Sequence, residues 1–154
     1  MTSLFLRAAE LSPQSADIHA VLGVLYNLSR EYPLAIEAFE AALKLRPTDY
    51  SLWNKLGATQ ANAMSCEAAV PCYVHALELK PQYVRALSNL GISYGNMRSY
   101  EAAAQCYLKA LSLNPDAKHI WNYLSMTFTS MSRPDLVEKA QLGDHNAFRA
   151  DFDF

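Results

Sequence analysis

Amide side chains recur at helical spacing in the middle of the chain. Asn54, Ala58 and Asn62 are four residues apart and therefore lie along one helix face, with Lys55 at its edge. An Asn side chain carries both a donor and an acceptor, which matches the alternating C=O and N–H groups of an extended peptide. A row of such amides can hold a peptide main chain with little regard for its sequence. This first stripe therefore predicts a peptide-binding wall.

A second stripe adds a guanidinium group to further amides. Arg85, Asn89, Ser93 and Asn96 follow spacings of four, four and three, which again define one helix face. With Lys55, Arg85 brings positive charge to a wall that is otherwise uncharged, and that charge suits a carboxylate. Each Asn costs roughly 0.5 kcal/mol of helix propensity relative to Ala, so four on inner faces imply a compensating use. The alternative is that each Asn simply lies on a solvated helix face.

The sequence contains no constellation that indicates catalysis. Its four histidines have no metal-ligand spacing among themselves or with the cysteines, and there is neither a Gly-rich phosphate loop nor a nucleophile elbow. Cys66, Cys72 and Cys106 are odd in number, lack a CxxC pair and recur near one phase of a helical pattern, as buried cysteines do. We predict no catalytic residue, no metal site, no cofactor and a reducing compartment.

Composition limits the class of protein further. The chain has 154 residues, of which 51% are hydrophobic and 18% charged, so it is too apolar to be disordered. Thirteen Lys plus Arg against fifteen Asp plus Glu give a formal charge of -2, without the basic excess that nucleic acid or anionic lipid requires. No apolar stretch approaches the 18 or so residues of a membrane span, and no signal-peptide pattern opens the chain. We expect a cytoplasmic protein with no nucleic-acid partner and no membrane span.

The chain overlays itself at a shift of 34 residues. The recurring positions are Leu22, Leu56 and Leu90; Gly23, Gly57 and Gly91; Ala35, Ala69 and Ala103; Phe39, Tyr73 and Tyr107; Ala42, Ala76 and Ala110; and Pro47, Pro81 and Pro115. This order is typical of the tetratricopeptide repeat, with Trp53 as the leading aromatic of one unit and His19 at the same phase of another. The period predicts an all-α, right-handed superhelical solenoid of helix pairs, whose first helices line the concave wall.

Each recurring residue type has a physical role. Gly and the first Ala are small where the two helices of a unit cross, and the aromatic side chain fills the wedge beside them. The Pro lacks the N–H that a further helical turn would need, so it ends the second helix. We expect first helices at 16–29, 50–63 and 84–97 and second helices at 33–46, 66–79 and 100–113, with a late start or a small kink at Pro71.

The two ends of the chain depart from the full repeat. Phe5, Ala8 and Pro13 fall at the aromatic, Ala and Pro phases of a preceding unit, so the chain is predicted to begin inside a repeat. The predicted divisions are the end of a truncated repeat at 1–15, repeats at 16–49, 50–83 and 84–117, and C-terminal capping helices with a tail at 118–154. The capping helices are expected near 117–131 and 135–149. A truncated end would expose Leu4, Phe5 and Leu11, which predicts self-association.

The inner stripe carries other residue types in the neighbouring units. Val21 and Leu28 occupy the phases of Lys55 and Asn62, which makes the inner face of the repeat at 16–49 apolar. Asp17, in the repeat at 16–49, and His119, in the C-terminal segment at 118–154, share the repeat phase of Arg85. We interpret these two as solvated helix starts, with a place in the groove as the alternative.

Several local strings resemble the receptor family for the type 1 peroxisomal targeting signal. They are LGVLYNLS at 22–29, LWNKLGAT at 52–59 and NLGIS at 89–93. The similarity is strong over residues 16–115 and weak around Ile120 and Trp121. It implies a domain that captures the extreme C-terminus of cargo, typically Ser-Lys-Leu, for peroxisomal or glycosomal import, and that cycles from the cytoplasm to the peroxisomal membrane.

The resemblance also implies roles for the two stripes. It assigns peptide contact to Asn54, Lys55, Ala58, Asn62, Arg85, Asn89, Ser93 and Asn96. The amides hold the backbone and the C-terminal residues, and Arg85 lies near the terminal carboxylate. Docking proteins at the peroxisomal membrane are expected to bind family regions that this chain lacks.

Two binding classes compete with this interpretation. An adaptor for an acidic chaperone tail, such as Glu-Glu-Val-Asp, would need several cations on successive inner stripes, whereas each unit here offers one. A scaffold that binds a folded protein through its convex surface is compatible with the sequence as an added role. A peptide-binding test separates these classes.

Overall fold

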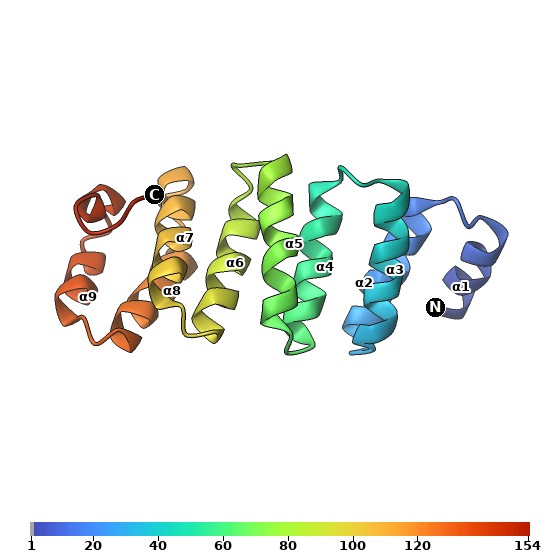
Figure 1. Cartoon of the computed structure of the whole chain (residues 1–154), viewed down its shortest axis with the longest axis horizontal. Helices are drawn as coiled ribbons and strands as arrows, with labels where there is room; N and C mark the ends of the chain where they lie inside the picture. The colour runs from blue at the N-terminus through green and yellow to red at the C-terminus, as the bar shows by residue number, and fades with distance from the viewer. Residues whose placement is uncertain (1) are drawn as a thin grey trace. The chain divides into compact units, whose positions relative to one another are not determined.

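Every regular element in residues 2–154, the part of the chain described by this computed structural model, is helical (Figure 1). The elements are α1 (Thr2–Leu11), α2 (Ala16–Leu28), α3 (Tyr32–Leu45), α4 (Tyr50–Asn62), α5 (Cys66–Leu79), α6 (Val84–Asn96), α7 (Tyr100–Leu113), α8 (Lys118–Ser130), α9 (Pro134–Gln141) and the 3-10 helix η1 (His145–Phe148). The all-α class predicted from the 34-residue period is confirmed. Among these described helices, none has the length and apolar character that crossing a bilayer would require.

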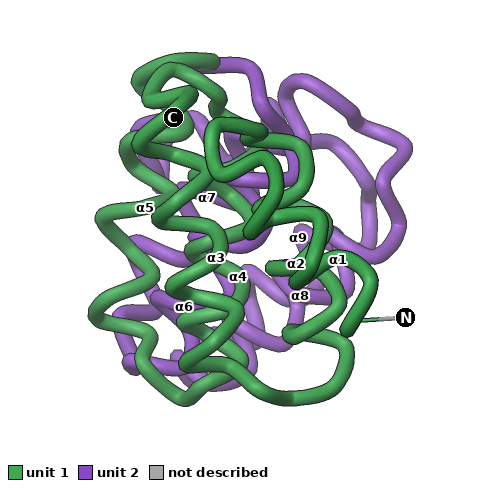
Figure 2. The backbone as a smooth tube through the Cα atoms, turned by 90° about the vertical axis from the view of Figure 1, so that its right-hand side faces the viewer, with its two compact units in different colours: residues 1–80 green, residues 81–154 purple. Residues whose placement is uncertain are grey.

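The backbone divides into two compact units, residues 1–80 and residues 81–154 (Figure 2). The first unit contains α1 and the helix pairs α2/α3 and α4/α5. The second contains the pairs α6/α7 and α8/α9, followed by η1 and the C-terminal tail. The six central helices begin and end within one residue of the ranges predicted from the sequence.

The turn inside each helix pair has a residue in the left-handed conformation, and this position recurs every 34 residues. The φ angles are 60° at Arg30, 64° at Met64, 62° at Arg98 and 56° at Ser132. In each turn the next residue donates its N–H to a carbonyl five positions earlier, as Arg133 does to Phe128 at 3.0 Å, which satisfies the end of the first helix. The turn at Ser132 shows that α8/α9 is a fourth helix pair of the same kind.

The contact of Gly with the aromatic side chain closes each full helix pair. A Cβ atom built on Gly23 would lie 2.6 Å from Cε1 of Phe39, and one built on Gly91 would lie 2.6 Å from Cε1 of Tyr107. Gly57 meets Tyr73 in the same way, at 2.8 Å. These distances leave no room for a side chain, which confirms that Gly is present because the helices approach closely.

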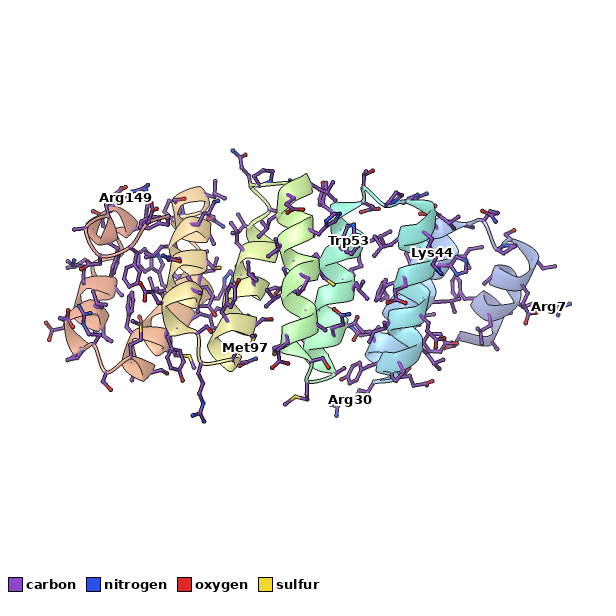
Figure 3. The ribbon with its side chains drawn as sticks, in the orientation of Figure 1. Arg7, Arg30, Lys44, Trp53, Met97 and Arg149 are labelled. Carbon is purple, nitrogen blue, oxygen red and sulfur yellow. The ribbon has the colours of Figure 1, made fainter. Side chains whose placement is uncertain are left out.

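The leading aromatic position ties each first helix to the preceding loop. Nε1 of Trp53 donates to the carbonyl of Pro47 at 2.8 Å, and Nε1 of Trp121 donates to that of Pro115 at 2.9 Å. Figure 3 shows Trp53 in the upper part of α4 as drawn. Nε2 of His19 forms the equivalent contact with the Pro13 carbonyl, also at 2.9 Å. His19 therefore takes the place of the leading aromatic residue in its repeat.

Pro71 lies inside α5 without moving the start of the helix. The helix begins at Cys66, as the repeat predicts, so the late start expected from this proline is wrong. Pro71 is the sixth residue of α5 and its ring is exposed. The missing N–H therefore removes one helical hydrogen bond, while the helix packs against α4 through the opposite face.

The C-terminal region folds differently from the single helix predicted at 135–149. α9 ends at Gln141, because Gly143 adopts a φ of 68° and breaks the helix before η1 begins. The tail then returns to α8, where the ring of Phe128 lies 5.4 Å from that of Phe148 and 5.7 Å from that of Phe152.

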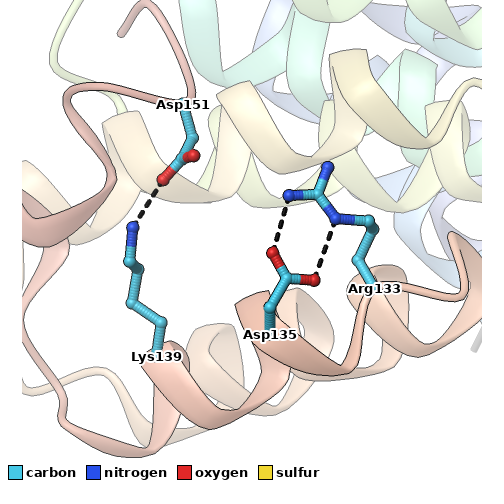
Figure 4. Close-up of polar contacts among 4 residues, drawn as sticks. All are labelled: Arg133, Asp135, Lys139 and Asp151. Atoms are coloured by element: carbon cyan, nitrogen blue, oxygen red, sulfur yellow. Dashed lines mark hydrogen bonds and ion pairs between the residues drawn. The ribbon is translucent and has the colours of Figure 1, made fainter.

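Two ion pairs accompany this packing (Figure 4). Nζ of Lys139 on α9 lies 2.7 Å from Oδ2 of Asp151 in the tail. Arg133 donates from Nε and Nη2 to the two carboxylate oxygens of Asp135, at 2.9 and 2.7 Å. The first of these pairs joins the tail to α9, and the second lies at the start of that helix. The tail is therefore part of the folded second unit.

Of the three apolar residues of α1 that were predicted to be exposed, Leu4 and Leu11 are exposed and Phe5 is not. Leu4 is 71% exposed and Leu11 is 78% exposed, and no residue of α1 is buried. Phe5 differs from the prediction, because it is partly buried and packs against the core of the first unit. The apolar surface at this end is therefore formed by the leucines.

Candidate peptide-binding site

In the first unit, the predicted stripe lies along α4 and varies in depth. Asn54 is only 4% exposed and makes contacts inside the protein, whereas Asn62 is exposed at the end of the helix. Ala58 lies between them and is half-buried. Nζ of Lys55 donates to Oγ of Ser51 at 2.7 Å, which holds the ammonium group along the helix surface. The exposed end of the stripe is therefore Asn62, and Asn54 lies mostly below the surface.

Asn62 has a partner that the sequence analysis missed. Its Nδ2 donates to Oδ1 of Asn27 at 3.3 Å, which joins the C-terminal ends of α4 and α2. The residue of α2 at the same repeat phase as Asn62 is Leu28. Repeat phase alone therefore selects Leu28 and not Asn27, which precedes it in the sequence. A signal was present in the sequence, since an amide next to an inner-stripe position can reach the adjacent repeat.

The surface of α2 around this amide pair is apolar. Val21 is 38% exposed, Val24 is 37% exposed and Leu28 is 75% exposed, and these residues hold the phases of Lys55, Ala58 and Asn62. The first unit thus has an exposed apolar stripe on α2 and a polar stripe on α4. An apolar stripe can take up aliphatic side chains, and the amide pair can bond to a main chain.

In the second unit, the other predicted stripe runs along α6. Arg85 and Asn96 are exposed at its two ends, and Asn89 is half-buried between them. Asn89 and Asn96 already make contacts within the protein. Ser93 is 1% exposed, and its Oγ is the one buried side-chain oxygen or nitrogen in the described chain that lacks a hydrogen-bond partner. Ser93 therefore belongs to the packed side of α6 and not to the open wall.

The two cations of the predicted site have no acidic partner. The four ion pairs present in residues 2–154 involve neither Lys55 nor Arg85. Figure 3 shows two further exposed cations, Arg7 and Arg30, projecting away from the ribbon. An unpaired guanidinium group on a helix face can form a charge-assisted pair with a carboxylate from outside the chain.

A cavity of about 300 Å³ lies beside the C-terminal end of the α6 stripe. Its walls come from α6, α7 and α8, and the residues that line it are Ile92, Gly95, Asn96, Tyr100, Tyr107, Tyr123, Met126, Thr127 and Ser130. Asn96 is the member that it shares with the predicted peptide-binding set. This cavity cannot be read from the sequence, because three helices must be brought together to form it.

The titratable groups of the described residues bear on the sequence-based expectations for metal and cysteine chemistry. In the described residues, no group of three or more His, Cys, Asp or Glu is placed to hold a metal ion. Burial raises the pKa of the Cys72 thiol to about 11, and burial raises the pKa of Cys106 to about 11 as well. Both thiols are therefore protonated at neutral pH and are poor nucleophiles. His75 contacts the ring of Trp53, with centroids 4.3 Å apart, and acts in packing.

Comparison with known families identifies the repeat directly. Residues 84–117 match one tetratricopeptide repeat family, and residues 3–50 match another. A crystal structure of MamA superposes with a TM-score of 0.85 at 19% sequence identity, over 99% of this chain and 85% of that one. At that identity the likeness concerns the fold alone.

Curated relatives are similar at higher sequence identity. The peroxisomal targeting signal 1 receptor of Dictyostelium discoideum is 53% identical over 155 residues, which cover 99% of this chain and 24% of that protein. The peroxisomal targeting signal receptor of Yarrowia lipolytica is 49% identical over 71 residues, or 44% of this chain and 12% of that protein. The human PEX5-related protein is 54% identical over 61 residues, or 38% of this chain and 10% of that protein. The chain spans about a quarter or less of these relatives. It is built of tetratricopeptide repeats and is similar in sequence to part of the peroxisomal targeting signal receptors.

Proposed function

We propose that this chain is part of a receptor that recognises C-terminal targeting peptides of the Ser-Lys-Leu type on cargo for peroxisomal or glycosomal import. The observation that carries the proposal is the α6 stripe, where an unpaired Arg85 and the amides of Asn89 and Asn96 share one helix face. The names of the similar receptors agree with this chemistry.

Each group has a part in the proposed binding mode. The guanidinium group of Arg85 attracts the terminal carboxylate, and the ammonium group of Lys55 is a second cation available to an acidic peptide. The amides of Asn62, Asn89 and Asn96 bond to the peptide main chain, and Asn27 orients Asn62. The apolar stripe on α2 is available to aliphatic side chains of the peptide. Binding of this kind requires no bond to be made or broken, so the chain acts as a receptor and not as an enzyme.

The proposal extends to partners and location. A receptor of this type meets its cargo in the cytoplasm and carries it to docking proteins at the peroxisomal membrane. Those docking contacts are proposed for parts of the receptor outside this chain, because the chain corresponds to 24% of the Dictyostelium relative.

The test is a fluorescence-anisotropy titration with a labelled peptide that ends in Ser-Lys-Leu and the same peptide amidated at its C-terminus. Both peptides are titrated with this chain and with a longer chain that adds further repeats at the N-terminal side. We expect the free acid to bind and the amide to bind about tenfold more weakly or worse, because a charge-assisted hydrogen bond contributes about 1.5 to 3 kcal/mol. The difference between the two chains measures what additional repeats contribute.

Two results would contradict the proposal. If neither chain binds the free acid, the receptor assignment fails. If a peptide ending in Glu-Glu-Val-Asp competes better than the Ser-Lys-Leu peptide, the chain is instead an adaptor for acidic chaperone tails.

A further inference from the structure

We propose that the cavity between α6 and α8 binds a large apolar side chain of the cargo peptide, upstream of its C-terminal tripeptide. This inference rests on the proposed function, since it assigns a second contact to the same bound peptide. It concerns only the second unit, where all the residues of the cavity lie.

The cavity lies between two successive first helices, α6 and α8, beside the C-terminal end of the α6 stripe. Ile92 on α6 and Met126 on α8 are 34 residues apart, and so are Asn96 and Ser130. Equivalent positions of neighbouring repeats therefore face the cavity from both sides. The α8 helix supplies one wall of this cavity, and the Ser132 turn gives it the geometry of a repeat helix.

The residues that line the cavity are uncharged and largely aromatic or apolar. None of the nine residues around the cavity is charged, so a charged side chain would lose its hydration there without gaining a partner. The rings of Tyr107 and Tyr123 stack with centroids 5.8 Å apart, and Tyr107 is only 3% exposed, which gives a rigid aromatic wall. Met126 is 66% exposed and flexible, so it can adapt to the shape of an incoming side chain. This combination selects apolar and aromatic side chains.

The cavity has the size of one side chain and lies about three helical turns from Arg85 along α6. A volume of about 300 Å³ is at the lower end of small-ligand pockets, which suits one side chain and not a folded partner. Arg85 and Asn96 are eleven residues apart on α6, which corresponds to about 16 Å along a helix. An extended peptide covers that length with about five residues. If its carboxylate is at Arg85, the side chain that reaches the cavity precedes the last three residues.

The test compares labelled ten-residue peptides that share the ending Ser-Lys-Leu. The reference peptide has Ala at all other positions, and three further peptides carry Phe at the fourth, fifth or sixth position from the C-terminus. We expect at least one Phe peptide to bind about tenfold more tightly than the reference, and a Glu at that position to give no gain.

Two variants locate the gain. Gly95 lines the cavity and a Cβ atom on it would meet nothing within 4 Å, so Gly95→Leu is designed to occupy part of the cavity. Met126→Lys places a charge at its rim. Each variant should abolish the advantage of the Phe peptide while the reference peptide still binds. Leu142→Lys is the matched control, because Leu142 is a similarly exposed apolar residue of the same unit that does not line the cavity.

The outcomes separate the inference from the proposed function. If the reference peptide binds and no Phe peptide binds more tightly, the inference fails and the receptor function stands. The inference also fails if the Phe advantage persists in both Gly95→Leu and Met126→Lys. If no peptide binds at all, the proposed function fails and the inference fails with it.

Discussion

Individual residues decide whether the inner stripes can bind a peptide. The stripes contain polar groups of two kinds: amides that already touch other protein groups, and cations that lack an acidic partner. Amides can bond to almost any main chain, so they contribute affinity without selecting a position along the peptide. A cation distinguishes the terminal carboxylate from every other part of the peptide, which makes Arg85 the residue that is most informative to change.

Replacement of Arg85 by Gln should weaken binding of the free-acid peptide about tenfold, because the charge-assisted contact is lost while the side-chain size is kept. The amidated peptide should be affected much less. Arg98→Gln is the control, since Arg98 is an exposed residue in the same unit and its replacement changes the net charge equally. Equal loss of affinity in both variants would show a general effect of charge instead of a specific contact.

Changes at Asn62 test the amide contact. We expect Asn62→Asp to weaken peptide binding more than Asn62→Ala, because the new anion repels an acidic peptide terminus. Asn27→Ala should weaken binding by less than about fivefold, because an exposed hydrogen bond of 3.3 Å contributes about 1 kcal/mol or less. Titration calorimetry with one peptide measures all three variants. The same affinity for Asn62→Asp and Asn62→Ala would rule out a carboxylate near this position.

Helix pairs are the elements that hold these residues, and the contact of Gly with the aromatic ring sets their spacing. The left-handed turns and the bonds of Trp53 and Trp121 to proline carbonyls recur with the same period. A stripe on a first helix is therefore held in place by contacts on the opposite side of that helix.

Two glycines of α6 provide a matched test of this packing. Gly91→Ala should destabilise the protein by about 1 to 3 kcal/mol, because the added Cβ would lie 2.6 Å from the buried ring of Tyr107. Gly95→Ala should stabilise it by up to about 1 kcal/mol, because its Cβ enters open space and Ala favours the helix. Urea unfolding measures both variants. A similar effect of the two substitutions would mean that the close approach at Gly91 does not limit the packing.

Over the whole molecule, the two units differ in how their ends are covered. In the second unit the tail packs on α8 through Phe148 and Phe152. In the first unit α1 has no buried residue and exposes Leu4 and Leu11. An exposed apolar helix of this kind favours association with a second apolar surface.

We therefore expect the chain to self-associate as its concentration rises, and the double variant Leu4→Glu, Leu11→Glu to shift that equilibrium toward the monomer. Leu142→Glu is the control, because Leu142 is as exposed, at 76%, and lies in the other unit. Sedimentation velocity over a wide concentration range measures the effect. A monomer mass that does not change with concentration would refute this prediction.

The sequence by itself determined the repeat, the helix pairs and the two candidate stripes. A period of 34 residues and a helical period of 3.6 are local properties, so Gly91, its aromatic partner and Arg85 could be assigned to helix faces by spacing alone. Where the pattern weakens, prediction was poorer. Ser125 takes the place of the repeat Gly there. The helix expected at 117–131 is present as α8, whereas the break at Gly143 inside the helix expected at 135–149 was not predicted.

Only the tertiary structure decided how deeply each stripe residue is buried and what it meets. Spacing assigns a residue to a face, but the depth of burial depends on how far the neighbouring helices extend over that face. Asn54 and Ser93 belong to the stripes by spacing, yet they are 4% and 1% exposed. The pairing of Asn62 with Asn27 and the cavity between α6 and α8 join residues that are distant in sequence, so they exist only once the helices have packed.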